Sequence, residues 1–174
     1  MKKERTRRLF FALWPDDRTR QALFHWQVHN LPGDLRWQHR ADLHMTLHFL
    51  GQVDPAWLEA LRDLGAEAAG EYFVVVLDEI GHWPRPQVLW AAPSSLPGEL
   101  LQLHARLATG LNALGLQVET RAFRPHVTLA RKVRNAPTAG PLAVLTWPVT
   151  VMALVESRAG DAPNYHPLAR WTLK

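Results

Sequence analysis

The segment Leu43–Gly51, LHMTLHFLG, places two histidines and a threonine inside an otherwise apolar run. Side chains alternate between the two faces of a β-strand, so the polar ones would share one face, namely His44, Thr46 and His48. The apolar residues between them would pack into a core on the opposite face. The segment therefore predicts a strand that is anchored by one face and presents imidazoles and a hydroxyl group on the other.

The segment Arg124–Lys132, RPHVTLARK, repeats this pattern with His126 and Thr128. Both segments contain the motif His-x-Thr-Leu, in which the histidine and the threonine are two residues apart and share a strand face. In each half of the chain a predicted helix precedes the motif. The repeat predicts two similar lobes that each contribute one strand to a shared cleft.

The rest of the chain divides into short predicted strands and three predicted helices. Alternating and β-branched segments predict strands over residues 7–14, 43–51, 72–81, 87–93, 123–131, 149–157 and 165–173. Apolar periodicity and capping residues, among them Asp16 and Asp54, predict helices over residues 16–30, 54–70 and 97–115. Residues 135–148, rich in proline, glycine and small side chains, predict a loop. This order lacks the strict strand–helix alternation of parallel sheets. We expect an α+β fold, mostly antiparallel, as one domain of two lobes over residues 1–174.

Composition limits the partners and the compartment. The 174-residue chain has a net charge of +4 and a pI of about 10.0, and most of its basic residues are arginine. The planar guanidinium group suits phosphate, which favours RNA as a partner. The absence of cysteine excludes disulfides and thiolate nucleophiles and fits a reducing compartment. The apolar run after the basic N-terminus is too short for a signal peptide or a membrane span, so we expect a cytoplasmic protein without membrane contact.

Two facing His-x-Thr strands would surround a small ligand with two imidazoles and two hydroxyl groups. Two imidazoles with near-neutral pKa values suit a proton transfer in which one takes a proton and the other donates one. The hydroxyl groups, with Arg131 at the end of the second strand, suit an anionic phosphate. The sequence has no glycine-rich phosphate loop and no acidic cluster typical of a two-metal site. We therefore expect chemistry that uses neither a metal ion nor a cofactor.

A different interpretation takes HMTLH as a zinc-binding pair, with His44 and His48 four residues apart on a helix. It lacks the glutamate of the HExxH motif, and the threonine and phenylalanine of this segment favour a strand.

Four stretches together resemble one known family: RLFFAL near the N-terminus, LHMTLHFLGQV, RPHVTLAR and the C-terminal YHPLARWTL. Their order and spacing are similar to those of the 2H phosphoesterase superfamily, and more closely to the RNA 2′,3′-cyclic phosphodiesterases, also called 2′-5′ RNA ligases. The resemblance implies a bilobal fold of two antiparallel sheets related by a pseudo-two-fold, with outer helices and a central cleft. It also implies hydrolysis of 2′,3′-cyclic phosphate at RNA ends to 2′-phosphate.

The resemblance implies a role for each motif residue. One of His44 and His126 would be the general base and the other the general acid, an order that the two similar motifs leave open. Thr46 and Thr128 would bind phosphate oxygens, and Arg131 would balance their charge. With a 5′-hydroxyl in place of water, the same site would join RNA ends through a 2′-5′ bond without ATP.

Less direct expectations concern the edges of the cleft. The resemblance suggests that Phe10 faces the cleft and stacks on the base, and that Tyr165 lines the cleft. Trp37 could border it, and three arginines could steer RNA phosphates: Arg36, Arg40 and Arg124.

Two alternatives to the RNA enzyme stay open. The first is a non-catalytic module that binds RNA ends or nucleotides, although two intact histidines favour an enzyme. The second is a phosphodiesterase for a small nucleotide such as ADP-ribose cyclic phosphate. For either enzyme we expect a monomer.

Overall fold

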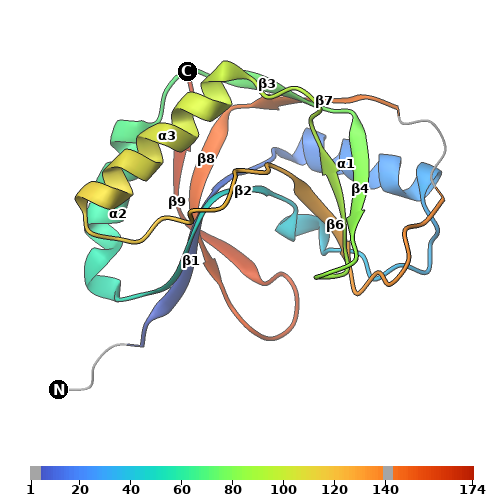
Figure 1. The fold of residues 1–174 in the computed structure, drawn as a ribbon, viewed down its shortest axis with the longest axis horizontal. Helices are drawn as coiled ribbons and strands as arrows, with labels where there is room; N and C mark the ends of the chain where they lie inside the picture. Colours follow the sequence, from blue (N-terminus) through green and yellow to red (C-terminus); the bar gives the residue numbers. More distant parts are fainter. Residues whose placement is uncertain (1–4, 139–142) are drawn as a thin grey trace.

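The structure is a computed structural model that describes residues 5–138 and 143–174 (Figure 1). Its strands are β1 (Arg7–Leu13), β2 (Met45–Val53), β3 (Phe73–Leu77), β4 (Glu79–Trp83), β5 (Val88–Ala92), β6 (Val127–Arg131), β7 (Leu145–Val149), β8 (Val151–Ser157) and β9 (Tyr165–Thr172). Its α-helices are α1 (Asp17–Asn30), α2 (Leu58–Ala68) and α3 (Gly98–Ala113). Short 3-10 turns are η1 (Arg40–Asp42) and η2 (Pro55–Trp57). No helix within the described ranges is long and apolar enough to cross a membrane.

Both predicted aspartate caps are present. The Asp16 carboxylate accepts a hydrogen bond from the backbone N–H of Thr19 at 2.7 Å and begins α1. The Asp54 carboxylate accepts from the backbone N–H of Ala56 at 3.0 Å, and Pro55 occupies the first position of the turn that leads into α2. Side-chain oxygens at these positions satisfy N–H groups that have no partner inside the helix.

The main sheet consists of two antiparallel halves. Strands β2, β1, β8 and β9 form one half, and β4, β5 and β6 form the other. The halves meet where β2 pairs with β6, at Met45 opposite Val127. Strands β3 and β7 form a separate two-stranded ladder. The predicted α+β fold with two antiparallel lobes is confirmed.

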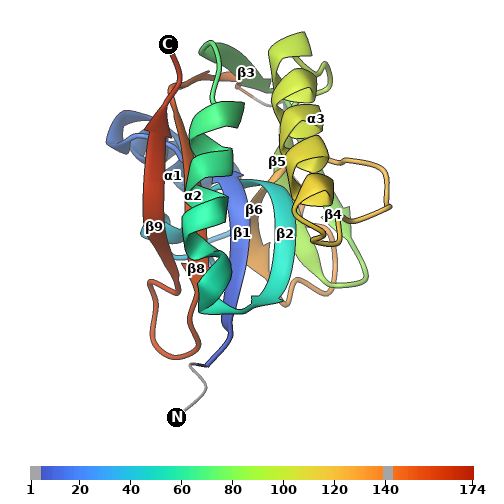
Figure 2. The ribbon, with the colours of Figure 1, turned by 90° about the vertical axis from the view of Figure 1, so that its left-hand side faces the viewer.

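Helices cover one face of the first half of the sheet. Helices α2 and α3 lie side by side over this half (Figures 1 and 2). Leu9, Phe11 and Leu13 of β1 are fully buried on that face. The alternate residues of β1, Phe10 and Ala12, belong to a smaller buried cluster on the opposite face. Because only one face of β1 meets the main core, the other face is available to form the floor of a site.

The two His-x-Thr-Leu motifs carry the same irregularity. On β2, Thr46 lies opposite Ala12 and His48 lies opposite the next residue, Phe11, so that Leu47 is an extra residue in the strand. Between β5 and β6, the pairing likewise leaves Leu129 as the extra residue. An extra residue of this kind is a β-bulge, which reverses the faces of the side chains that follow it. The shared bulge extends the predicted repeat from sequence to backbone geometry.

Three predicted element boundaries were wrong. The single strand predicted over residues 72–81 is divided at Asp78, whose carboxylate accepts a hydrogen bond from the backbone N–H of Ser94. Strands β3 and β4 therefore pair with different partners. The predicted loop over residues 135–148 contains most of β7, because Trp147 fills the core at 0% exposure. Residues 139–142 of that segment lie outside the described residues. The strand predicted over residues 123–131 begins only at Val127.

Candidate active site

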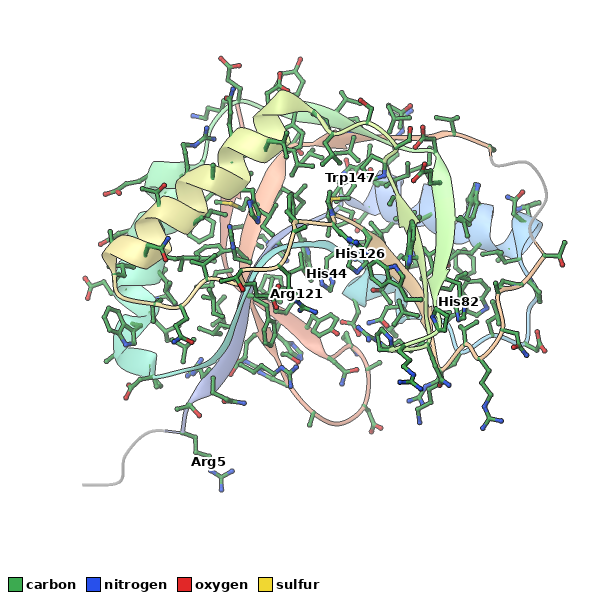
Figure 3. The ribbon with its side chains drawn as sticks, viewed as in Figure 1. Arg5, His44, His82, Arg121, His126 and Trp147 are labelled. Atoms are coloured by element: carbon green, nitrogen blue, oxygen red, sulfur yellow. The ribbon has the colours of Figure 1, made fainter. Side chains whose placement is uncertain are left out.

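The two motif histidines lie at the junction between the two halves of the sheet. His44 directly precedes Met45 and His126 directly precedes Val127, and these two core residues are paired with each other. In an antiparallel pair, the flanking residues lie across from one another on the face opposite the central pair. That register sets His44 across from Thr128 and Thr46 across from His126. Figure 3 labels both histidines near the centre of the molecule, between the halves.

Both imidazoles are held in the same tautomer by a hydrogen bond to the backbone carbonyl two residues earlier. Nδ1 of His44 lies 2.7 Å from the carbonyl oxygen of Asp42, and Nδ1 of His126 lies 2.7 Å from that of Arg124. A carbonyl oxygen can only accept, so Nδ1 carries the hydrogen in both rings. In the neutral imidazole, Nε2 then has a free lone pair. Each histidine therefore presents a nitrogen that can accept a proton.

His44 is enclosed by aromatic side chains and by its own motif. Its Nε2 accepts a hydrogen bond from the Thr46 hydroxyl at 3.0 Å, as the predicted side-by-side placement requires. Its ring stacks on Trp14 at 6.1 Å between centroids, and Phe10 and Tyr165 each lie 4.9 Å away. The pKa of His44 is lowered to about 4, mainly by burial and also by the charges of Arg131 and His126, against the raising effect of the hydrogen bond to the Asp42 carbonyl.

His126 has fewer aromatic neighbours. The ring of Trp83 meets it edge-on at 4.6 Å. Burial lowers the pKa of His126, and the Arg131 charge acts in the same direction, while the hydrogen bond to the Arg124 carbonyl opposes both. The charge of Arg131 thus acts on both imidazoles in the same direction.

Arg131 ends β6 and is exposed to solvent. Its Nη2 donates a hydrogen bond to the Tyr165 hydroxyl at 3.4 Å, and its Nε donates to the Gln38 side chain at 3.3 Å. Neither partner is charged, and no described carboxylate forms an ion pair with Arg131. The guanidinium is therefore available to bind an anion.

The structure brings most of the predicted site residues together. Thr128 lies opposite Trp90 in the pairing of β5 and β6. Phe10 faces the cleft side of the sheet as predicted, but it is only 3% exposed because His44 and Tyr165 cover it. A ring covered in this way supports the imidazole and leaves no free face for the predicted stacking on a base. Trp37 forms an isolated bridge with Ala130 and lines one of the adjoining cavities.

The prediction that His48 shares a face with His44 and Thr46 was wrong. The bulge at Leu47 turns His48 towards the helices, where it is 4% exposed. Its Nε2 donates a hydrogen bond to the carbonyl oxygen of His104 at 2.8 Å, and the two rings stack at 4.0 Å. The same bulge turns Phe49 to the cleft side, where it packs against the small cluster around Phe10.

Two cavities have predicted site residues in their walls. The first, which we call the arginine cavity, has a volume of about 630 Å³ and is reached past Arg131 and Tyr165. The second, the aromatic cavity, has a volume of about 660 Å³ and includes Thr46 and His126 in its wall. Aromatic rings also line the second cavity: those of His48, Phe49, Trp83, His104 and Phe123. Arg131 therefore borders one cavity, and Thr46 and His126 border the other.

The described residues contain no group of three or more histidine, aspartate or glutamate side chains placed to hold a metal ion. His44 and His48, the alternative zinc pair, lie on opposite faces of the strand region, and His48 is engaged with α3. The zinc-binding interpretation of this segment is therefore not compatible with the structure.

Comparison with known proteins agrees with this geometry. The sequence profile of the 2′-5′ RNA ligase superfamily matches residues 15–161, a range that contains both motifs. The chain belongs to the 2′-5′ RNA ligase superfamily. The RNA 2′,3′-cyclic phosphodiesterase of Escherichia coli (strain K12) is 34% identical to it over 169 residues, which cover 95% of this chain and 96% of that protein.

Solved structures of the superfamily share the whole fold. E. coli LigT in its apo form is 32% identical, with a TM-score of 0.86 and coverage of 98% of this chain and 99% of LigT. E. coli LigT complexed with 3′-AMP has the same identity and TM-score, with coverage of 97% and 98%. These likenesses confirm the predicted family, the predicted fold and the predicted class of enzyme, a phosphodiesterase.

Sequence patterns did not reveal Asp42 and Arg20, two buried residues whose hydrogen bonds hold segments next to the site. Asp42, 1% exposed, accepts hydrogen bonds from the backbone N–H groups of Asn164 and Tyr165, while its own carbonyl oxygen holds His44. Arg20, 7% exposed, donates to three backbone carbonyls, those of Pro15, Arg40 and Leu43. Most of these partners are distant in the sequence, so no local pattern could identify them.

Proposed function

We propose that this enzyme hydrolyses the 2′,3′-cyclic phosphate at the 3′ end of RNA to a 2′-phosphate, without a metal ion. The observation that carries the proposal is the junction at Met45 and Val127, which gathers two histidines and two threonines on one face. Two imidazoles, one neutral to accept a proton and one protonated to donate it, and two hydroxyl donors beside a guanidinium are the groups that an in-line phosphoryl transfer needs. The name of the E. coli relative supports RNA as the substrate.

One histidine takes a proton from a water molecule as the water oxygen attacks phosphorus. The bond between phosphorus and the 3′ oxygen breaks, and the other histidine donates its proton to that oxygen. The product carries a 2′-phosphate and a 3′-hydroxyl. Thr46, Thr128 and Arg131 donate hydrogen bonds to the non-bridging oxygens, where negative charge grows in the transition state.

We further propose that the enzyme acts as a cytoplasmic monomer with one domain over residues 1–174. Both imidazoles come from one chain, so the proposed site is complete without a second copy. A chain without cysteine suits a reducing compartment.

The test uses a short RNA that ends in a 2′,3′-cyclic phosphate, incubated with the enzyme in EDTA. His44→Ala and His126→Ala should each lower kcat by about 10² to 10⁴-fold, the usual contribution of a general acid or base. The product should carry the phosphate on the 2′ oxygen. A loss below tenfold would remove that histidine from the mechanism, and RNA binding without any turnover would favour the non-catalytic module.

We also propose 2′-5′ joining as a second activity, because two separate cavities border residues of the proposed site, one at Arg131 and one at Thr46 and His126. A 5′-hydroxyl of a second RNA would replace water as the nucleophile, and the reverse reaction would cleave a 2′-5′ bond. Addition of a 5′-hydroxyl RNA to the assay should yield a 2′-5′-linked product that both alanine variants fail to make. A reaction that gives only the 2′-phosphate at saturating 5′-hydroxyl RNA would exclude this activity.

A further inference from the structure

The arginine cavity differs from the aromatic cavity in the charge of its walls. It lies where β1 begins and where β2 and β8 end. The segment 36–39, which runs beside β6, forms its other wall. Its volume of about 630 Å³ is within the range of cavities that bind small organic ligands. Five arginines line it: Arg7, Arg8, Arg36, Arg131 and Arg158.

The acidic side chains in its wall are already engaged. Asp42 accepts the backbone N–H groups of Asn164 and Tyr165. Glu156 pairs with Arg158 at 2.7 Å and lies 3.8 Å from Arg7. The three other arginines have no carboxylate partner among the described residues, namely Arg8, Arg36 and Arg131. The cavity therefore keeps positive charge that only an anion from outside can neutralise.

Two of these free arginines, Arg8 and Arg36, line the same cavity as Arg131 of the proposed phosphate site. Arg8 shares a face of β1 with Phe10, because β1 pairs with β8 without interruption. The guanidinium of Arg8 lies 4.9 Å from the centre of the Phe49 ring. This contact holds it over the cleft side of the sheet.

Arg36 lies in the wall of the arginine cavity that the segment 36–39 forms. Its carbonyl oxygen accepts a hydrogen bond from the backbone N–H of Arg131 at 3.0 Å, so the two residues are neighbours across paired segments. Arg8, Arg36 and Arg131 thus line one cavity from β1, from the segment 36–39 and from β6. Several fixed cations in one cavity match the repeated charge of a phosphodiester backbone.

The aromatic cavity offers a poorer match to a polyanion. Three arginines line it, Arg85, Arg121 and Arg124, and Arg121 lies 2.9 Å from Glu119, so that two arginines without a carboxylate partner among the described residues remain, against three in the arginine cavity. Stacked rings of His48, His104 and Phe123 occupy another part of the wall. This chemistry suits a nucleoside better than successive phosphates.

We propose that the arginine cavity binds the phosphodiester backbone of the strand that precedes the cyclic end, and so selects oligoribonucleotides over mononucleotides. The inference rests on the proposed function. The phosphate that joins the terminal ribose to the preceding nucleotide would lie against Arg8 and Arg36, while Arg131 stays with the reacting phosphate. A mononucleotide lacks that second phosphate and would leave both arginines without a partner.

The experiment compares two substrates and two charge-matched variants. The substrates are a nucleoside 2′,3′-cyclic phosphate and a tetranucleotide that ends in the same group. The test variant is Arg8→Gln/Arg36→Gln. The control is Arg18→Gln/Arg62→Gln, which removes the same charge from exposed positions on α1 and α2 that line neither cavity.

For the wild type, kcat/KM for the tetranucleotide should exceed that for the mononucleotide by at least about tenfold, since hydrogen bonds to charged groups contribute about 1.5 to 3 kcal/mol each. The test variant should bring this ratio close to one, and the control variant should retain it. Affinity for a tetranucleotide 2′-phosphate, measured by fluorescence anisotropy against salt, should lose about 0.7 of slope for each phosphate contact removed.

Equal kcat/KM for the two substrates in the wild type, or a ratio that survives in the test variant, would overturn the inference. Turnover of the mononucleotide would leave the proposed function intact in both cases. If neither substrate is turned over, the proposed function fails. The product affinities then decide the inference separately, because they require no catalysis: a tetranucleotide that binds no tighter than a 2′-nucleotide would reject it.

Discussion

Replacement of Asp42 by asparagine tests the idea that one buried carboxylate anchors the site. The residue is 1% exposed, and its oxygens accept the backbone N–H groups of Asn164 and Tyr165 at 2.9 to 3.0 Å. The asparagine side chain would keep one acceptor oxygen and would turn its NH₂ group towards a backbone N–H. The change removes one charge-assisted hydrogen bond and leaves a buried donor without a partner, and each effect costs about 1 to 3 kcal/mol.

Because these two costs partly overlap, we expect Asp42→Asn to lower the free energy of unfolding by about 2 to 4 kcal/mol. For a chain of this length, that corresponds to a fall in Tm of about 4 to 15 °C. Activity should fall as well, since the Tyr165 ring lies 4.9 Å from His44 and its hydroxyl accepts from Arg131. Displacement of Tyr165 should lower kcat/KM by about 10 to 100-fold.

Thermal unfolding by circular dichroism and cyclic-phosphate hydrolysis below both transitions measure the two effects. Asp54→Asn is the matched control, because Asp54 is an exposed helix cap and asparagine caps as well as aspartate. Its stability should change by less than about 0.5 kcal/mol. A change of that size for Asp42→Asn as well would refute the assignment of Asp42 as a structural anchor.

Three further changes test the site and its support. Burial and Arg131 lower the pKa of both His44 and His126, so kcat/KM should peak below pH 6.5 and fall above it as the acid loses its proton. Arg131→Gln should move this peak to higher pH. A rate that still rises above pH 7 would contradict the prediction. Dialysis against EDTA should leave hydrolysis unchanged, whereas a loss that added metal restores would reveal a metal site. Gly81→Ala should destabilise the fold by about 1 to 3 kcal/mol, as measured by urea unfolding, because the added Cβ would meet the side chain of Trp90; unchanged stability would mean that this ring can move aside.

Much of the secondary structure could be predicted from residue patterns within single elements. The apolar runs along residues 7–14 and 149–157 predicted β1 and β8, and periodicity predicted all three helices, because these patterns depend only on the residues within one element. The capping roles of Asp16 and Asp54 followed from residue type and position. The repeated His-x-Thr-Leu motif led to the candidate site for the same reason, since each histidine and its threonine are two residues apart on one strand.

Local patterns failed where a partner strand decides the outcome. The alternation of residues 145–149 is present in the sequence, but the preceding proline and glycine residues obscured it, and only the pairing with β3 establishes β7. His48 is the sharper case. Strict alternation placed it beside Thr46, whereas the bulge at Leu47 directs it into the contact with His104.

The amino-acid sequence by itself determined the three helices, the family and the two pairs of motif residues, because each depends on residue types at short spacing. The tertiary structure alone decided how those pairs meet. A single antiparallel contact between Met45 and Val127 sets the two motifs across from each other. Asp42 and Arg20 became part of the site only through partners that the fold brings from elsewhere in the chain. Register and long-range hydrogen bonds depend on which strands pair, and that choice is made by the packing of the whole core.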